Sequence, residues 1–149
     1  WPRRTLLPTQ QGILVNRGER DGVRVGSLLM SSEGLVGRVI ETTPTTSLGL
    51  LVTDSDSRVA GLTERTRETG LLVGMAGSWC QLIYVDPAAD IAVGDRVVTA
   101  GLDGAFPKGL PVGTVDQVVR HGGGTSLSVR VRPAAMLRRI EEVLIIPPA

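Results

Sequence analysis

Cysteine and histidine are each present only once in these 149 residues, and their scarcity argues against several kinds of chemistry. Cys80 has no second cysteine with which to form an intramolecular disulfide, whereas small secreted domains that depend on disulfides carry several cysteines. His121 is the only imidazole, so a Ser-His-Asp triad would have to be built on it. Because three glycines follow His121, we expect it in a solvent-exposed loop, where a catalytic base is poorly held.

The chain also lacks an excess of charge and a long apolar run. Sixteen basic residues balance fifteen acidic ones, a formal net charge of +1, so no global field recruits nucleic acid or an acidic membrane surface. The charged run at residues 64–68 has balanced signs and is expected to be a solvated loop. No run approaches the roughly 18 apolar residues of a membrane-spanning helix, and no signal peptide is visible. Since the sequence begins at Trp1 and not at Met, we expect a cut or processed piece of a longer protein, from which any anchor would have been removed.

Candidates for metal binding and nucleophilic catalysis are few, and each has a structural interpretation. Asp54 and Asp56 have a D-x-D spacing, but neither the glycine nor the distal glutamate of a calcium loop follows, so we expect a turn or junction. Cys80 follows Trp79 at the start of an apolar run, with no second histidine to activate it, so a half-buried structural thiol is expected. The sequence therefore predicts no catalytic residue, no metal site and no cofactor.

The residues that are abundant favour β structure. Aromatic residues make up 3% of the chain, whereas there are 19 glycines and 9 prolines. With frequent Val, Leu and Thr, this composition indicates many short strands joined by tight turns. The cleanest alternation of apolar and polar residues is at residues 126–132, which predicts one buried and one solvated face. We predict strands at residues 13–16, 27–31, 35–41, 48–53, 58–63, 70–75, 81–86, 96–100, 112–119, 126–132 and 143–146, and one or two helical turns at residues 134–140.

One phrase of the sequence occurs twice. Residues 21–39 and 90–115 share the pattern V-G-x-x-hydrophobic, a turn, and then G-L-(P)-V-G-x-V. The second occurrence is longer, because residues 101–108 are inserted in its turn. Two occurrences are too few for a solenoid, so we expect two related β subdomains, each built around the same hairpin.

Glycines punctuate both copies where tight turns are expected, because glycine adopts backbone angles that other residues avoid. We predict structural turns at Gly26, Gly37, Gly94, Gly101, Gly104, Gly109 and Gly113. The longer turn also holds Phe106, the only phenylalanine, which could plug the end of a barrel. The alternative is a partner-binding patch, since apolar side chains on loops often mark interfaces. That patch would consist of Leu102, Phe106, Pro107 and Leu110.

Three longer phrases and the end of the chain carry a family resemblance. They are D-G-V-R-V-G with G-L-V-G-R-V in residues 21–39, L-L-V-T-D-S-D-S-R-V with E-R-T-R-E-T-G-L-L-V-G in residues 50–74, and V-G-D-R-V-V-T-A-G-L-D-G-A-F-P-K-G-L-P-V-G-T-V in residues 93–115. Together with the closing L-R-R-I-E-E-V-L-I-I, they closely resemble the MreC family of bacterial rod shape-determining proteins. The likeness runs in the same order over nearly the whole chain from Gly12 onward.

The resemblance implies an all-β fold of two small β-barrel-like subdomains, the second inserted into the first. Residues 1–54 with 141–149 would form the first subdomain and residues 55–140 the second, so that the final strand returns to the first. The resemblance also implies the periplasmic region of an inner-membrane protein, which dimerises through a coiled coil. The membrane helix and the coiled coil of such a protein would be missing from this chain.

The function implied is that of a non-catalytic periplasmic scaffold of the cell elongation machinery. It would bind a class B penicillin-binding transpeptidase and other morphogenetic membrane proteins, and so organise peptidoglycan synthesis and cell shape. Its means of binding would be exposed sheet edges and apolar loop patches. The residues leave two alternatives open. One is a hydrolase with the two-barrel layout of chymotrypsin-like proteases, and the other is an RNA-binding barrel, which the near-neutral charge disfavours.

Overall fold

The computed structural model describes residues 11–101 and 107–148, which form short strands and one 3-10 helix, η1 (Glu19–Asp21). The all-β fold expected from the resemblance is confirmed. In the described part of the chain no helix is long and apolar enough to cross a membrane. The strands are β1 (Gly12–Val15), β2 (Leu28–Met30), β3 (Leu35–Thr42), β4 (Ser47–Leu51), β5 (Arg58–Thr63), β6 (Thr69–Gly74), β7 (Cys80–Ile83), β8 (Arg96–Thr99), β9 (Pro111–His121), β10 (Ser126–Pro133) and β11 (Leu144–Ile146).

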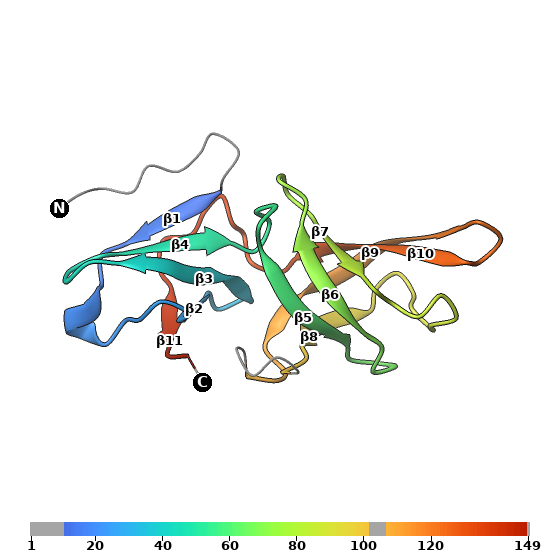
Figure 1. Cartoon of the computed structure of the whole chain (residues 1–149), viewed down its shortest axis with the longest axis horizontal. Coiled ribbons are helices and arrows are strands. Elements are labelled where there is room, and N and C mark those ends of the chain that lie inside the picture. Colours follow the sequence, from blue (N-terminus) through green and yellow to red (C-terminus); the bar gives the residue numbers. More distant parts are fainter. Residues whose placement is uncertain (1–10, 102–106, 149) are drawn as a thin grey trace.

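These strands form an open sheet and a closed barrel that lie side by side (Figure 1). The open sheet has the order β1-β4-β3-β2-β11, and the barrel has the order β10-β7-β6-β5-β8-β9. β11 pairs antiparallel with β2, so the chain returns to the first sheet after completing the barrel. The insertion of the second subdomain into the first is therefore confirmed, although the first is an open sheet with edges at β1 and β11. The subdomain boundaries near residues 54 and 141 stay a prediction.

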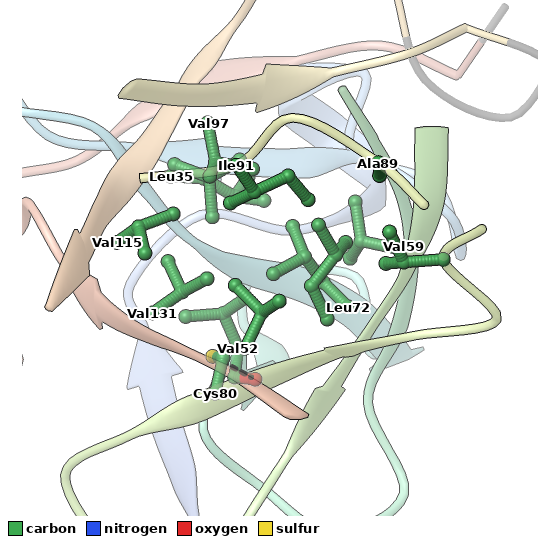
Figure 2. Close-up of a cluster of buried hydrophobic side chains, with 14 of the residues drawn as sticks. Leu35, Val52, Val59, Leu72, Cys80, Ala89, Ile91, Val97, Val115 and Val131 are labelled. Atoms are coloured by element: carbon green, nitrogen blue, oxygen red, sulfur yellow. Dashed lines mark hydrogen bonds between the residues drawn. The ribbon is translucent and has the colours of Figure 1, made fainter. Parts of the chain in front are cut away.

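One hydrophobic core is shared by the sheet and the barrel. Alternate residues of the barrel strands point inward and are fully buried, among them Leu72, Leu82 and Val129. Leu35 and Val52, which belong to the open-sheet side, pack into the same cluster, as Figure 2 shows. Since burial of apolar surface is the dominant favourable contribution to folding, the two parts stabilise each other.

Hydrogen bonds tie the two parts together as well. The Cys80 thiol donates to the Val52 carbonyl at 3.4 Å, and the Ala76 amide donates to the Thr53 carbonyl at 2.9 Å. At Gly74 a Cβ atom would lie 1.9 Å from the Asp54 carbonyl oxygen, so only glycine allows the chains to pass this closely.

The repeated phrase has the same local structure in both copies. Gly26 and Gly94 both have a positive φ, 95° and 98°, in the region that favours glycine. The Gly26 amide donates to the Val39 carbonyl at 2.9 Å, and the Gly94 amide donates to the Val115 carbonyl at 2.8 Å. In each copy this bond joins the turn to the second strand after it, β3 in the first copy and β9 in the second, so the sequence repeat is also a repeat of hydrogen bonding.

The predicted helical turns at residues 134–140 are wrong. The segment contains a single turn, in which the Arg139 amide donates to the Met136 carbonyl at 2.9 Å, and otherwise runs without regular structure. Of the apolar residues whose spacing suggested a helix, Leu137, Ile140 and Val143 instead pack against the core of the open sheet. β7 also ends at Ile83, before its predicted end, because Tyr84 adopts a left-handed conformation with a φ of 58°.

Candidate protein-binding surface

The structure describes only part of the predicted patch in the inserted turn. Leu102 and Phe106 lie outside the described residues, as does the predicted turn glycine Gly104. Pro107 is exposed, whereas Leu110 is half-buried and packs against the core. Leu110 is also held by its backbone, since its amide donates to the Thr99 hydroxyl and its carbonyl accepts from the Thr99 amide, both at 2.9 Å. A partner-binding role for this turn stays a prediction.

Glycines at both ends of the inserted turn have left-handed backbone angles. Gly101 has a φ of 70° and Gly109 a φ of 91°. A Cβ atom at Gly101 would also lie 3.0 Å from the Lys108 side chain. These angles are accessible to glycine at little cost, which accounts for glycine at both places.

The two residues considered for catalysis, His121 and Cys80, lie in surroundings that suit a structural role. His121 is exposed at the end of β9, where its carbonyl accepts from the Gly124 amide at 3.0 Å and closes the hairpin turn. Cys80 is fully buried and not half-buried as predicted, and burial raises the pKa of its thiol to about 12. At neutral pH this thiol is therefore protonated, which suits packing and not nucleophilic attack.

Asp54 is a buried residue whose carboxylate holds the junction between the sheet and the barrel. Its Oδ1 accepts from the Gln11 amide at 2.7 Å, and its Oδ2 accepts from the Asp56 amide at 2.8 Å. Both oxygens thus bind backbone amides of the junction.

The charged run at residues 64–68 is predicted to be a solvated loop, but ion pairs attach it to the rest of the barrel. Arg65 donates from Nε to Asp95 Oδ1 at 2.7 Å and from Nη2 to Asp95 Oδ2 at 3.0 Å, which makes the ion pair bidentate. Its Nη1 also lies 3.2 Å from Asp90 Oδ2. The Arg65 guanidinium holds the pKa of the buried Asp95 carboxyl below its usual range. The loop is therefore fixed to the turn that precedes β8.

The outer face of the barrel carries apolar side chains where β6, β7, β10 and β9 lie side by side. Leu71 lies opposite Ile83, and both side chains are half-buried outside the barrel wall. Val73 is the next outward residue of β6. At the end of this hairpin the Met75 amide donates to the Trp79 carbonyl at 3.1 Å. We call the barrel-face patch the set of Leu71, Val73, Met75, Trp79, Ile83, Val119 and Arg130.

Two side chains of this patch, Arg130 and Trp79, are held in place by contacts. The guanidinium carbon of Arg130 lies 4.2 Å from the centroid of the Trp79 ring, a cation–π contact. The Nε of Arg130 donates to Asp116 Oδ1 at 2.9 Å. Both side chains therefore lose little conformational freedom when a partner binds, which lowers the cost of association.

A shallow pocket of about 180 Å³ lies next to this pair. Met75, 51% exposed, and Val119, 36% exposed, contribute apolar surface to it. Trp, Met and Arg are the side chains enriched in the centres of protein interfaces. Gln81, Gln117 and Ser128 also line the pocket, together with the buried Cys80 and Val129.

Sequence reasoning missed this surface, although a signal was present. Residues 71–73 are three consecutive apolar residues, so β6 is apolar on both of its faces. In an antiparallel sheet with one face on the core, the other face is usually polar. An apolar outward face on such a strand indicates a binding surface.

The fold and the barrel-face patch define a class of protein: a small all-β protein in which an open sheet adjoins a closed barrel with apolar side chains on its outer face. The chain belongs to the MreC family, because the family model for "Rod shape-determining protein MreC, barrel core" matches residues 3–147. It is 39% identical over 134 residues to the cell shape-determining protein MreC of Cereibacter sphaeroides, covering 90% of this chain and 43% of that protein. It is 32% identical over 142 residues to MreC of Haemophilus influenzae, covering 94% of this chain and 40% of that protein. The chain thus spans less than half the length of these relatives.

Solved structures agree with this assignment. The crystal structure of MreC from Pseudomonas aeruginosa is 36% identical and superimposes with a TM-score of 0.89, covering 93% of this chain and 90% of that one. MreC in its complex with the penicillin-binding protein PBP2 from Helicobacter pylori superimposes with a TM-score of 0.65. That likeness covers 79% of this chain and 74% of the other, and at 22% identity it shows the shared fold alone.

Proposed function

We propose that this chain is the periplasmic part of a cell-shape protein and acts as a non-catalytic scaffold that binds a class B penicillin-binding transpeptidase. Its membership of the MreC family supports the role in cell shape, because the relatives reported above are named as cell shape-determining proteins. The solved complex of the Helicobacter pylori relative with PBP2 supports a penicillin-binding protein as partner. None of these names describes a hydrolase, and the hydrolase alternative has no support.

The observation that carries the proposal is the ordered Trp79–Arg130 pair within the barrel-face patch. We infer that the transpeptidase lays apolar side chains against Met75 and Val119 while Trp79 and Arg130 form the centre of the contact. The other residues of the patch stand on paired strands, and Met75 and Trp79 flank the turn between β6 and β7, where the Met75 amide donates to the Trp79 carbonyl. The side chains of the patch therefore hold their positions before the partner arrives. Holding the transpeptidase and other morphogenetic membrane proteins on one scaffold would organise peptidoglycan synthesis within the elongation machinery.

The test is a binding measurement between this chain and the purified periplasmic region of a class B penicillin-binding protein from the same bacterium. Replacing Met75 and Val119 together by Glu places two charges in the contact, and we expect affinity to fall by at least about tenfold. Val25 is 60% exposed on the open-sheet side, so Val25→Glu is the control and should leave affinity unchanged. Circular dichroism checks that each variant folds.

The possible outcomes test the identity of the partner and the location of the contact surface separately. If the unsubstituted chain does not bind the penicillin-binding protein by calorimetry, the proposed function is wrong. If it binds and the Met75→Glu, Val119→Glu variant binds equally well, the contact lies away from the barrel face.

The inserted turn is the other candidate contact. Phe106→Ala, measured in the same assay, distinguishes its two interpretations. A binding role predicts weaker affinity with unchanged thermal unfolding, whereas a plug in the barrel predicts a loss of stability of about 3–5 kcal/mol.

A further inference from the structure

A second concave surface lies where the open sheet meets the barrel. It is a groove of about 860 Å³, which we call the junction groove. One wall is formed by the start of β1 and the end of β4, another by the turn between β6 and β7, and the third by the segment that follows β10. The volume falls within the roughly 300–1,000 Å³ range of pockets that hold organic ligands or peptide side chains, and is far larger than one inorganic anion needs.

The charge of the junction groove has one sign. Arg132, Arg138 and Arg139 line it, and no Asp or Glu is among its lining residues in the described part of the chain. All three arginines are exposed, and none of their guanidinium groups forms a hydrogen bond or an ion pair with another described residue. The ten residues before Gln11 include two arginines and no acidic residue, so they supply no side-chain carboxylate. In a chain of net charge +1, this groove concentrates positive charge.

The fold separates these charges from acidic neighbours in the sequence. Glu141 and Glu142 follow Arg139 almost directly, yet they line a different groove, beside β1. Ile140 lies between the two pairs and packs against the core of the open sheet, which directs the arginines and the glutamates to different sides. The arginines and glutamates of this segment therefore do not neutralise each other's charge.

The floor of the junction groove adds apolar surface to its charge. Met136 is 53% exposed within it, and Leu137 and Ala76 also contribute. Arginine binds carboxylates through two parallel hydrogen bonds, which favours a carboxylate over a less directional anion. A ligand that satisfies both features carries carboxylates and apolar side chains together.

We propose that the junction groove binds an acidic, amphipathic peptide segment of a partner protein. The carboxylates of the segment pair with Arg132, Arg138 and Arg139, and its apolar side chains lie on Met136 and Leu137. No residue of the barrel-face patch lines this groove, although the turn between β6 and β7 borders both surfaces. The proposal does not depend on a penicillin-binding protein being the partner.

The test uses a rhodamine-labelled peptide of twelve residues that alternates leucine and glutamate, and follows its fluorescence anisotropy as this chain is added. We expect binding to weaken as the NaCl concentration is raised from about 0.05 M to about 0.5 M, because added salt screens the attraction between exposed charges. Arg138→Glu with Arg139→Glu should weaken binding by at least about tenfold, because two charge-assisted contacts become repulsive. Arg20→Glu with Arg24→Glu changes the net charge equally at exposed positions elsewhere and should leave binding unchanged.

Other measurements keep the test decisive. If the double glutamate variant does not fold, Arg138→Gln with Arg139→Gln neutralises both charges without reversing them and should still weaken binding. No binding of the leucine-glutamate peptide, or equal loss of binding in the Arg20, Arg24 control, would overturn the proposal. So would tighter binding to phosphatidylglycerol vesicles than to the peptide, which would assign the groove to a membrane surface.

Discussion

Gly37 and Gly113 occupy the same place in the two copies of the repeated hairpin, and the same contact requires glycine at both. A Cβ atom on Gly37 would lie 2.1 Å from the Leu50 carbonyl oxygen, and one on Gly113 would lie 2.1 Å from the Arg132 carbonyl oxygen. Both lie within strands, β3 and β9, and not in the turns that were predicted for them. Neither has a positive φ, so the close approach of the neighbouring strand is what excludes a side chain.

We expect Gly37→Ala and Gly113→Ala each to lower the free energy of unfolding by about 1–3 kcal/mol, because backbone must move to admit the methyl group. Urea unfolding followed by circular dichroism measures the change. Gly77→Ala is the matched control, since no atom lies within 4 Å of a Cβ built there. Equal effects at Gly37 and Gly77 would contradict the steric explanation.

At the scale of the element, the loop between β5 and β6 is fastened by charge. Arg65 reaches the turn before β8 and pairs with Asp95, which also accepts from the Ala92 amide at 2.9 Å. In the first copy of the repeat Ser27 takes the place of Asp95, and its hydroxyl accepts from the Arg24 amide at 3.1 Å. The second copy thus keeps the turn bond and adds an ion pair.

This ion pair predicts a pH dependence of stability. The folded state lowers the pKa of Asp95 below its ordinary value of 3.8, so its contribution is present above that pH and is lost as the pH falls through the lower, folded value. Arg65→Met should therefore unfold at lower urea than the unsubstituted chain at pH 7, with a difference that shrinks below pH 4. Arg67→Met in the same loop is the control. A difference that stays constant down to pH 2 would argue that Arg65 acts through packing alone.

Sequence patterns located the strands more accurately than they described the segment after β10. Most strands were located to within a few residues, because alternation and turn residues are local properties of the chain. The segment 134–140 was misjudged because its apolar spacing fits a helix, whereas Ala135 and Ile140 bind a sheet that is distant in sequence. The barrel-face patch was missed for a related reason, since Trp79 and Arg130 meet only through strand pairing.

At the scale of the whole molecule, the shared core couples the open sheet to the barrel. Leu35 belongs to β3 of the sheet, is fully buried, and packs in the cluster that contains Leu72 and Val131 of the barrel (Figure 2). A cavity at this position removes contacts from both parts.

We expect Leu35→Ala to destabilise the protein by about 2–5 kcal/mol, and to do so for the sheet and the barrel together. Hydrogen exchange provides the measurement, because it reports the opening of each strand separately. Amides of β3 and of β7 should lose protection by similar amounts. Faster exchange confined to the open sheet would show that the two parts unfold independently.

The sequence by itself determined the all-β class, the position of most strands, the repeated hairpin and the family, because each depends on local pattern along the chain. Tertiary structure alone decided which apolar residues stay exposed on the barrel, since register between distant strands selects the outward face. It also decided that Arg65 meets Asp95 and that the arginines and glutamates of residues 138–142 face different grooves. These are consequences of burial and strand pairing, which bring together side chains that no local pattern relates.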